Sequence, residues 1–121
     1  MDMTHPAKKA VASYWSARTC GTQFAQSEKF SSDYFSEIEE ARYRLEPYIP
    51  SFAEFRRYHG KKVLEVGLGA GTDFVQWVRA GAFAYGVDLT SEAIEHTRRR
   101  LELEGLEAVD LRRADAERLD Y

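Results

Sequence analysis

The spacing of apolar residues changes near residue 60. Before that point apolar positions recur every three or four residues, which is typical of amphipathic helices. Pro6 suits a first helical position, and a helical pattern of apolar residues then runs from Ala7 until Gly21. A second helix is predicted between Ser31 and Pro47. Its apolar face would consist of Tyr34, Phe35, Ile38, Ala41 and Leu45.

A short third helix is predicted from a capping-box pattern. Ser51 and Glu54 have the spacing in which each side chain satisfies a backbone N–H at a helix start, and Phe52 and Phe55 would be its apolar residues. We therefore expect residues 1–59 to form an N-terminal helical segment that caps the following domain.

After Lys61, short β-branched and apolar runs alternate with helical patterns. Strands are predicted over residues 63–66, 83–87 and 108–113, and helices over residues 72–80 and from Thr90 or Ser91 to Gly105. This alternation indicates an α/β fold with a parallel sheet, in which ligands bind at the carboxyl ends of the strands. We expect residues 60–121 to form this domain.

Composition limits the classes of protein that fit this pattern. The 121 residues are 44% hydrophobic and 31% charged, and no apolar stretch reaches the roughly 18 to 20 residues of a membrane helix. The net charge of −3 disfavours a nucleic-acid binder, and the lone Cys20 excludes an intrachain disulfide and a multi-cysteine metal site. The N-terminus lacks signal-peptide features. We expect a cytoplasmic protein without a metal, a nucleic-acid partner or a membrane partner.

Residues 63–73 read VLEVGLGAGTD, a predicted strand that breaks into glycines at alternate positions. Gly67, Gly69 and Gly71 fall where the strand turns into a helix, and glycine lets the backbone approach a ligand closely. The free amides of a helix N-terminus favour a carboxylate, a phosphate or a ribose there. Simple packing of the helix on the strand is the alternative explanation of this loop.

Acidic residues around the loop narrow the choice of ligand. The spacing is G-x-G-x-G rather than the G-x-G-x-x-G of dinucleotide sites, and Thr72 stands in place of the third glycine. Asp73 would oppose a pyrophosphate but could accept a hydrogen bond from an ammonium group. Glu65 adds a second carboxylate at the strand end. Asp88 ends the second strand, where a carboxylate can accept hydrogen bonds from both hydroxyls of a ribose.

With these features, residues 60–121 resemble the class I S-adenosylmethionine-dependent methyltransferases, particularly the small-molecule branch called type 11. The resemblance rests on three motifs in order, which are EVGLGAG at residues 65–71, GVDLT at residues 86–90 and ADAERL at residues 114–119. It implies a Rossmann-like sheet, S-adenosyl-L-methionine as the cofactor, and a small-molecule methyl acceptor.

The resemblance also implies roles for single residues. Asp88 would hold the ribose, Leu89 would pack against the adenine, and Asp115 would face the adenine together with Ala116. The residues at the loop would shape the methionine pocket. The full set of expected cofactor-binding residues is Glu65, Gly67, Gly69, Gly71, Thr72, Asp73, Asp88, Leu89, Asp115 and Ala116. No catalytic residue is assigned, because the family's acceptor-side residues follow the matched segment.

The family's domain continues with a fourth strand, which pairs with the first strand. Without it, the outer edge of residues 63–66 would be exposed, and an exposed apolar edge is a template for pairing with another chain. We therefore expect a truncated cofactor-binding half that forms a homodimer or a swapped assembly, unless the N-terminal helices cover the edge.

Two other functions are compatible with the motifs. One is a non-catalytic module that binds S-adenosylmethionine or a nucleotide. The other is part of an NAD-dependent oxidoreductase, although the glycine spacing and Asp73 count against NAD.

Some residues outside the motifs also have two interpretations. The aromatic residues Tyr14, Trp15, Tyr34 and Phe35 could cover a sulfonium cation, but their helical spacing favours a place in the core. His96 and the run Arg98–Arg100 are expected on the surface.

Overall fold

The computed structural model describes residues 7–8 and 21–119. Its elements, with η for a 3-10 helix, are η1 (Thr22–Phe24), α2 (Ser32–Leu45), α3 (Ile49–Ala53), η2 (Phe55–Tyr58), β1 (Lys62–Val66), α4 (Thr72–Arg79), β2 (Phe83–Asp88), α5 (Ser91–Leu103), β3 (Asp110–Arg113) and η3 (Ala116–Arg118). Ala7 and Lys8 are helical, and the rest of the first predicted helix lies outside the described residues. Within the described part, no helix has the length and apolar character needed to cross a bilayer.

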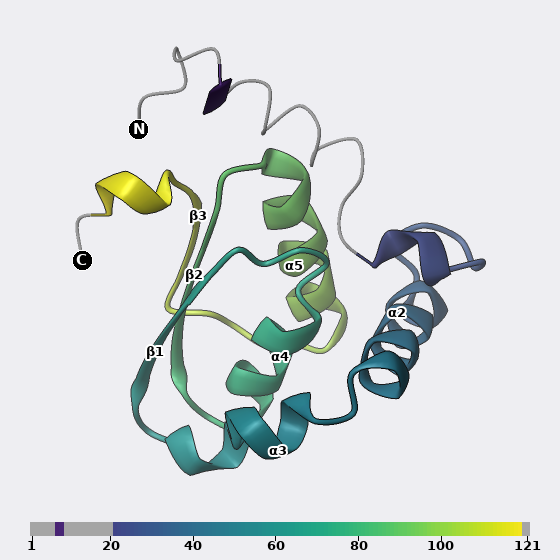
Figure 1. Ribbon diagram of the computed structural model, residues 1–121, viewed down its shortest axis with the longest axis horizontal. Helices are drawn as coiled ribbons and strands as arrows, with labels where there is room; N and C mark the ends of the chain where they lie inside the picture. The colour runs from purple at the N-terminus through teal and green to yellow at the C-terminus, as the bar shows by residue number, and fades with distance from the viewer. Residues whose placement is uncertain (1–6, 9–20, 120–121) are drawn as a thin grey trace.

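Three parallel strands form one sheet in the order β1-β2-β3 (Figure 1). Val66 of β1 is in register with Val87 of β2, and Asp88 of β2 is in register with Arg113 of β3. The carboxyl ends of the strands therefore meet at one end of the sheet. The predicted α/β fold with a Rossmann-like parallel sheet is confirmed, although β3 begins at Asp110 and not at residue 108.

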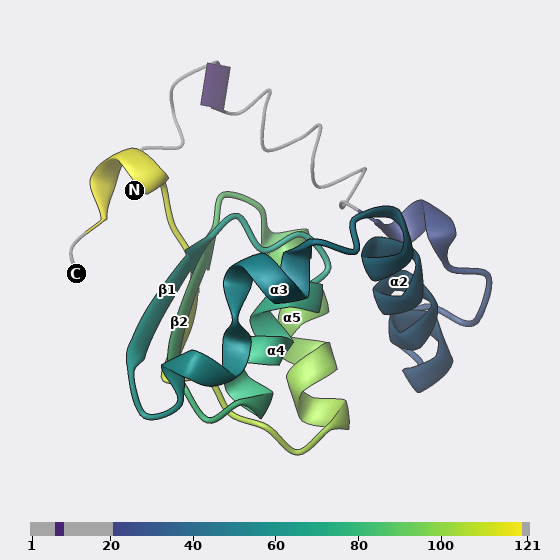
Figure 2. The same ribbon diagram turned by 60° about the horizontal axis from the view of Figure 1, so that its bottom comes forward.

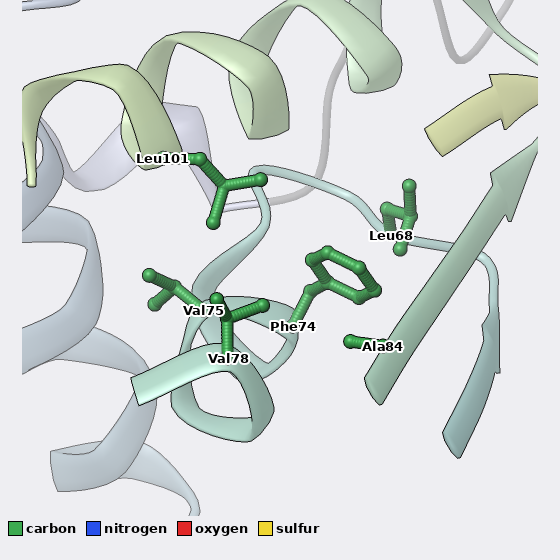
Figure 3. Close-up of a cluster of buried hydrophobic side chains, with 6 residues drawn as sticks. All are labelled: Leu68, Phe74, Val75, Val78, Ala84 and Leu101. Atoms are coloured by element: carbon green, nitrogen blue, oxygen red, sulfur yellow. The ribbon is translucent and has the colours of Figure 1, made fainter. Parts of the chain in front are cut away.

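Helices α4 and α5 lie on the same face of the sheet (Figures 1 and 2). Between the helices and the sheet is a core of Leu68, Phe74, Val75, Val78, Ala84 and Leu101 (Figure 3). Phe74 and Val75 on α4 are completely buried. Full burial of such side chains stabilises the fold by roughly 1.5–3 kcal/mol each, so this layer holds α4 and the loop that precedes it.

The opposite face of the sheet carries no helix among the described residues. Leu64, Val66 and Phe83 are 42%, 51% and 52% exposed on this face. They alternate with Glu65 and Ala84, whose side chains contact α4 residues. The expectation of a buried first strand is therefore wrong, because only one of its two faces is covered. No described strand pairs with the outer edge of β1, and the homodimer expected to cover that edge stays a prediction.

Helix α2 packs against the glycine loop through its first turns. The Ser31 hydroxyl accepts a hydrogen bond from the Tyr34 N–H at 3.1 Å and caps the helix as predicted. Tyr34 and Phe35 are buried in a cluster with Ala70 of the loop, which confirms their interpretation as core residues. Tyr14 and Trp15 lie outside the described residues. Leu45, predicted on the buried face of α2, is 58% exposed because it borders a cavity.

One carboxylate of α2 binds both α4 and α5. Oε1 of Glu39 accepts hydrogen bonds from Gln76 at 2.8 Å, Arg79 at 3.1 Å and Arg100 at 3.0 Å. The expectation that the arginine run of α5 is solvated is wrong for Arg100. Its side chain is buried because its guanidinium pairs with Glu39 and also with Glu104.

His96 is buried, and the expectation of a surface position is wrong. Only 1% of its surface is exposed. Its Nδ1 lies 2.9 Å from the carbonyl oxygen of Glu92, and its Nε2 lies 2.8 Å from the hydroxyl of Tyr34. Burial lowers the pKa of His96. A neutral ring that donates from Nδ1 and accepts at Nε2 satisfies both contacts and joins α2 to α5.

The predicted capping box at Ser51 is also wrong. Helix α3 already begins at Ile49, with Pro50 in its first turn, so Ser51 lies inside the helix. Glu54 instead ends α3 with a φ of 50°, and its carboxylate pairs with Arg57 at 3.0 Å. The predicted third helix is consequently divided into α3 and η2.

Candidate ligand-binding site

A cavity of about 1030 Å³ lies at the carboxyl ends of the strands. This volume is at the upper end of the range for small-molecule sites. The predicted cofactor residues that line it are Glu65, Gly67, Gly69, Thr72, Asp73, Asp88, Leu89, Asp115 and Ala116. Gly71 is absent from the lining. Among the residues described, no group of histidine, cysteine or acidic side chains is arranged to hold a metal ion.

Two side chains between the glycines anchor the loop in separate hydrophobic clusters. Leu68 is 5% exposed and packs with Phe74 in the core below α4 and α5. Ala70 is 4% exposed and packs in the cluster formed by α2. Gly67 and Gly69 have φ values of 81° and 57°, and both line the cavity. Since Leu68 and Ala70 point into the protein, the glycine backbone borders the cavity.

Gly71 serves the packing of α5. A Cβ atom at this position would lie 2.8 Å from Oγ1 of Thr97, which is closer than Cβ atoms approach other atoms in proteins, and 3.0 Å from its Cα, which is tighter than most Cβ contacts. Its φ of 83° is also unfavourable for other residues. The expectation that Gly71 contacts a cofactor is therefore not supported by its position, and helix packing accounts for this glycine.

The carboxylate of Asp88 joins β2 to the glycine loop. Oδ2 accepts a hydrogen bond from the Leu68 N–H at 2.7 Å, and Oδ1 accepts from the N–H and the hydroxyl of Thr90 at 2.9 and 3.0 Å. An ionised carboxylate accepts about four hydrogen bonds. Asp88 can therefore accept one further bond, at Oδ2, and a second ribose hydroxyl would have to replace a Thr90 donor.

The carboxyl group of Glu65 lies below the loop beside α4. Its Oε1 accepts a hydrogen bond from the Trp77 indole N–H at 3.1 Å. Burial raises the pKa of Glu65 to about 8, and the negative charge of Asp73 adds to this rise. A cation placed next to Glu65 would favour its ionised form. Glu65 is therefore a group whose proton can be exchanged for a bound ammonium group.

Asp73 is held by two residues of α2 that the sequence did not indicate. Arg42 donates to both carboxylate oxygens of Asp73, at 2.8 and 2.5 Å, and the Tyr43 hydroxyl donates at 2.9 Å. Asp73 lines the cavity, but its charge is already paired. No sequence pattern indicated these contacts, because they depend on how α2 packs against α4.

Asp115 forms the far end of the cavity. Its Oδ1 accepts a hydrogen bond from the Glu117 N–H at 2.9 Å and caps η3. Its Oδ2 accepts from the ammonium group of Lys8, and this contact lowers the pKa of Asp115. Lys8 also lines the cavity. No pattern in the sequence indicates this pair, because 107 positions separate the two residues.

A further part of the cavity wall is apolar and comes from η1 and α2. It includes Phe24, Ile38 and Leu45, of which Phe24 and Leu45 are 42% and 58% exposed. None of the three was predicted as a site residue. Their position depends on how the N-terminal half packs across the loop, which local patterns do not encode.

Comparison with known proteins relates the second half of the chain to methyltransferases. Residues 63–121 match a family described as a methyltransferase domain. The chain is also 43% identical over 58 residues to the ubiquinone biosynthesis O-methyltransferase of Actinobacillus pleuropneumoniae serotype 5b (strain L20). That match covers 48% of this chain and 24% of the relative, so the chain spans about a quarter of the relative's length. No solved structure gives a significant match.

Proposed function

We propose that this chain binds S-adenosyl-L-methionine and forms the cofactor-binding part of a small-molecule methyltransferase. The match of residues 63–121 to a methyltransferase domain supports this proposal. The observation that carries the proposal is the single cavity shared by Glu65, Asp88 and Asp115. These carboxylates come from the ends of β1 and β2 and from the segment after β3, in the order of the sequence motifs.

The charges around the cavity suit a cationic ligand. The described acidic residues in its wall are Glu46, Glu65, Asp73, Asp88, Asp115 and Glu117, and the described basic residues are Lys8, Arg42 and Arg118. Lys8 and Arg42 are already paired with carboxylates. An excess of carboxylates attracts a sulfonium and an ammonium group, and it repels the pyrophosphate of a dinucleotide such as NAD.

Each part of the cofactor has a matching group in the cavity. Asp88 accepts a hydrogen bond from a ribose hydroxyl, and Asp115 accepts from the adenine amino group. Glu65 binds the ammonium group of the methionine part. Arg42 borders the cavity and would exchange part of its contact with Asp73 for the carboxylate of the methionine part, a pairing that guanidinium groups favour. Leu89, Ala116 and Thr72 supply contacts around these groups, and the backbone at Gly67 and Gly69 allows close approach.

When bound, S-adenosyl-L-methionine supplies a methyl group that is already activated by the positive charge on sulfur. The protein then has to hold an acceptor within attack distance and exclude water. The apolar wall of Phe24, Ile38 and Leu45 offers a surface for such an acceptor. The similar protein from Actinobacillus is named as an O-methyltransferase. We therefore propose a hydroxyl group on a small, largely apolar molecule as the acceptor.

Calorimetric titration of the chain with S-adenosyl-L-homocysteine tests the cofactor proposal. We expect one-to-one binding that NAD does not displace. A chain that is folded by circular dichroism but does not bind S-adenosyl-L-homocysteine would overturn the proposal.

Methyl transfer requires a separate experiment. Labelled S-adenosyl-L-methionine would be incubated with the chain and a panel of substituted phenols, and labelled methyl ethers would be the expected products. Binding without transfer to any acceptor would instead favour the non-catalytic binding module.

A further inference from the structure

We propose that Lys8 and Asp115 together recognise the purine ring of the cofactor through hydrogen bonds. Asp115 accepts a hydrogen bond from the adenine 6-amino group, and the Lys8 ammonium group donates to the ring nitrogen beside that amino group. The inference rests on the proposed function and adds a binding residue from the N-terminal segment. Lys8 would thereby make that segment part of the cofactor site.

The geometry of the pair is the first support for this role. The Lys8 ammonium group is hydrogen-bonded to Oδ2 of Asp115, and it lies 3.3 Å from Oε2 of Glu117. The side chain of Lys8 is 21% exposed and that of Asp115 is 6% exposed. All three residues line the cavity. A donor and an acceptor therefore lie next to each other at the same end of the site.

Both partners keep hydrogen-bonding capacity for a ligand. An ammonium group donates three hydrogen bonds, and Lys8 directs two of them to Asp115 and Glu117. A carboxylate accepts about four, and Asp115 accepts two, from Lys8 and from the Glu117 N–H. A ligand can thus bind beside the pair without breaking it.

Adenine has the complementary arrangement of groups. Its 6-amino group is a donor, and each ring nitrogen that flanks it, N1 on one edge and N7 on the other, is an acceptor. A 6-oxopurine presents a carbonyl oxygen in place of the amino group, and that oxygen would face the Asp115 carboxylate. The Lys8–Asp115 pair therefore matches adenine and opposes a 6-oxopurine.

The test combines one variant with altered ligands in calorimetric titrations. The ligands are S-adenosyl-L-homocysteine, its 1-deaza and 7-deaza analogues, which each lack one ring nitrogen, and the 6-oxo analogue S-inosyl-L-homocysteine. We expect the wild-type chain to bind one deaza analogue about 10- to 150-fold more weakly than the parent, because one charge-assisted hydrogen bond is lost. Lys8→Met should bind S-adenosyl-L-homocysteine more weakly than the wild type does, by a similar factor. It should bind S-adenosyl-L-homocysteine and that deaza analogue equally well.

Lys29→Met is the matched control. Lys29 also forms a lysine–carboxylate pair, with Glu92 at 2.9 Å, but it does not line the cavity. It should bind all four ligands like the wild type. Thermal unfolding by circular dichroism would show that both variants are folded.

Three results would overturn the inference. Tighter binding by Lys8→Met would mean that Lys8 competes with the ligand for Asp115. If Lys8→Met still binds one deaza analogue more weakly than the parent ligand, by the same factor as the wild type, then Lys8 makes no contact with the ring. Failure of the wild-type chain to bind S-adenosyl-L-homocysteine at all would overturn the proposed function and this inference with it. If the wild-type chain binds S-adenosyl-L-homocysteine and only Lys8→Met departs from the expected result, this inference is overturned and the proposed function is not affected.

Discussion

The glycine loop begins with Gly67 and ends with Gly71, and these two glycines have different surroundings. In the first half, Gly67 borders the cavity, and a Cβ atom there would meet no other atom within 4 Å. In the second half, Gly71 lies against Thr97 of α5, where a Cβ atom would clash with the backbone. Glycine is thus compatible with a ligand at one position and required by a helix at the other. A glycine pattern in a sequence does not distinguish these two causes.

Replacing each glycine by alanine tests this difference most directly. Gly71→Ala adds backbone strain and a contact of 3.0 Å with Thr97, so we expect the free energy of unfolding to fall by about 2–5 kcal/mol. Gly67→Ala adds only the strain of its φ of 81°, about 1–2 kcal/mol. Urea unfolding followed by circular dichroism would measure both losses. Equal losses would contradict the division of the loop.

Asp88 holds the first half of the loop through the Leu68 N–H. We expect Asp88→Ala to weaken the binding of S-adenosyl-L-homocysteine by about 1.5–3 kcal/mol, because a charge-assisted hydrogen bond to the ribose is lost. Calorimetry measures this change. Asp33→Ala, which removes an exposed acid from α2 outside the cavity, is the control and should bind like the wild type. Unchanged affinity of Asp88→Ala would remove Asp88 from the site.

Glu65, in β1 just before the loop, should also make stability depend on pH. Its pKa is about 8 in the folded chain, above the ordinary value of 4.5. The folded state therefore binds this proton more tightly than the unfolded chain. The contribution to stability is complete below pH 4.5 and is lost as the pH rises through about 8. Glu65→Gln should remove this dependence in urea unfolding, and an unaltered pH profile would contradict the environment described for Glu65.

The second half should respond to pH in the opposite direction through His96. Ala70 packs against Tyr34, whose hydroxyl contacts His96. The pKa of His96 is lowered from 6.5, so its contribution is complete above that pH and is lost as the pH falls through its folded value. Acid should therefore loosen α2 first. Near-ultraviolet circular dichroism would follow this change, and His96→Gln should reduce its dependence on pH.

The smallest effect on folding is expected at the strand that leads into the loop. We propose that a second copy of the chain pairs with the outer edge of β1, where no strand of the described residues lies. Leu64→Lys should abolish this dimer in light scattering, while the stability of the monomer changes by no more than about 0.5 kcal/mol, because Leu64 is 42% exposed. Leu103→Lys, at a similarly exposed position on α5, is the control. A monomeric wild-type chain would contradict the proposal.

Sequence motifs were sufficient to predict the sheet, and nine of the ten expected cofactor residues line the cavity. Glu65 lies at the end of a predicted strand, Asp88 and Asp115 follow the next two, and parallel strands bring their carboxyl ends together. Patterns could not reveal Lys8 or Arg42, because their partners depend on how the N-terminal half packs on the loop.

The same limit applies to the polar residues that proved to be buried. His96 and Arg100 belong to residue types that are usually exposed, and each is buried only because a partner on α2 satisfies it. The partner is not adjacent in sequence, so helical spacing alone places both residues on the wrong side. Gly71 is the opposite case. Its motif assigned it to a ligand, but its position in the structure is explained by contact with α5.

The hydrogen bond from the Leu68 N–H to Asp88 also provides a spectroscopic signal for ligand binding. Because the amide nitrogen lies 2.7 Å from a carboxylate oxygen, the amide proton should resonate far downfield in a nuclear magnetic resonance spectrum. Any ligand that shares the oxygen changes the electron density at the amide, although the Leu68 side chain is buried in the core. A single peak from the loop backbone would therefore report the occupancy of the ribose position without a label on the ligand.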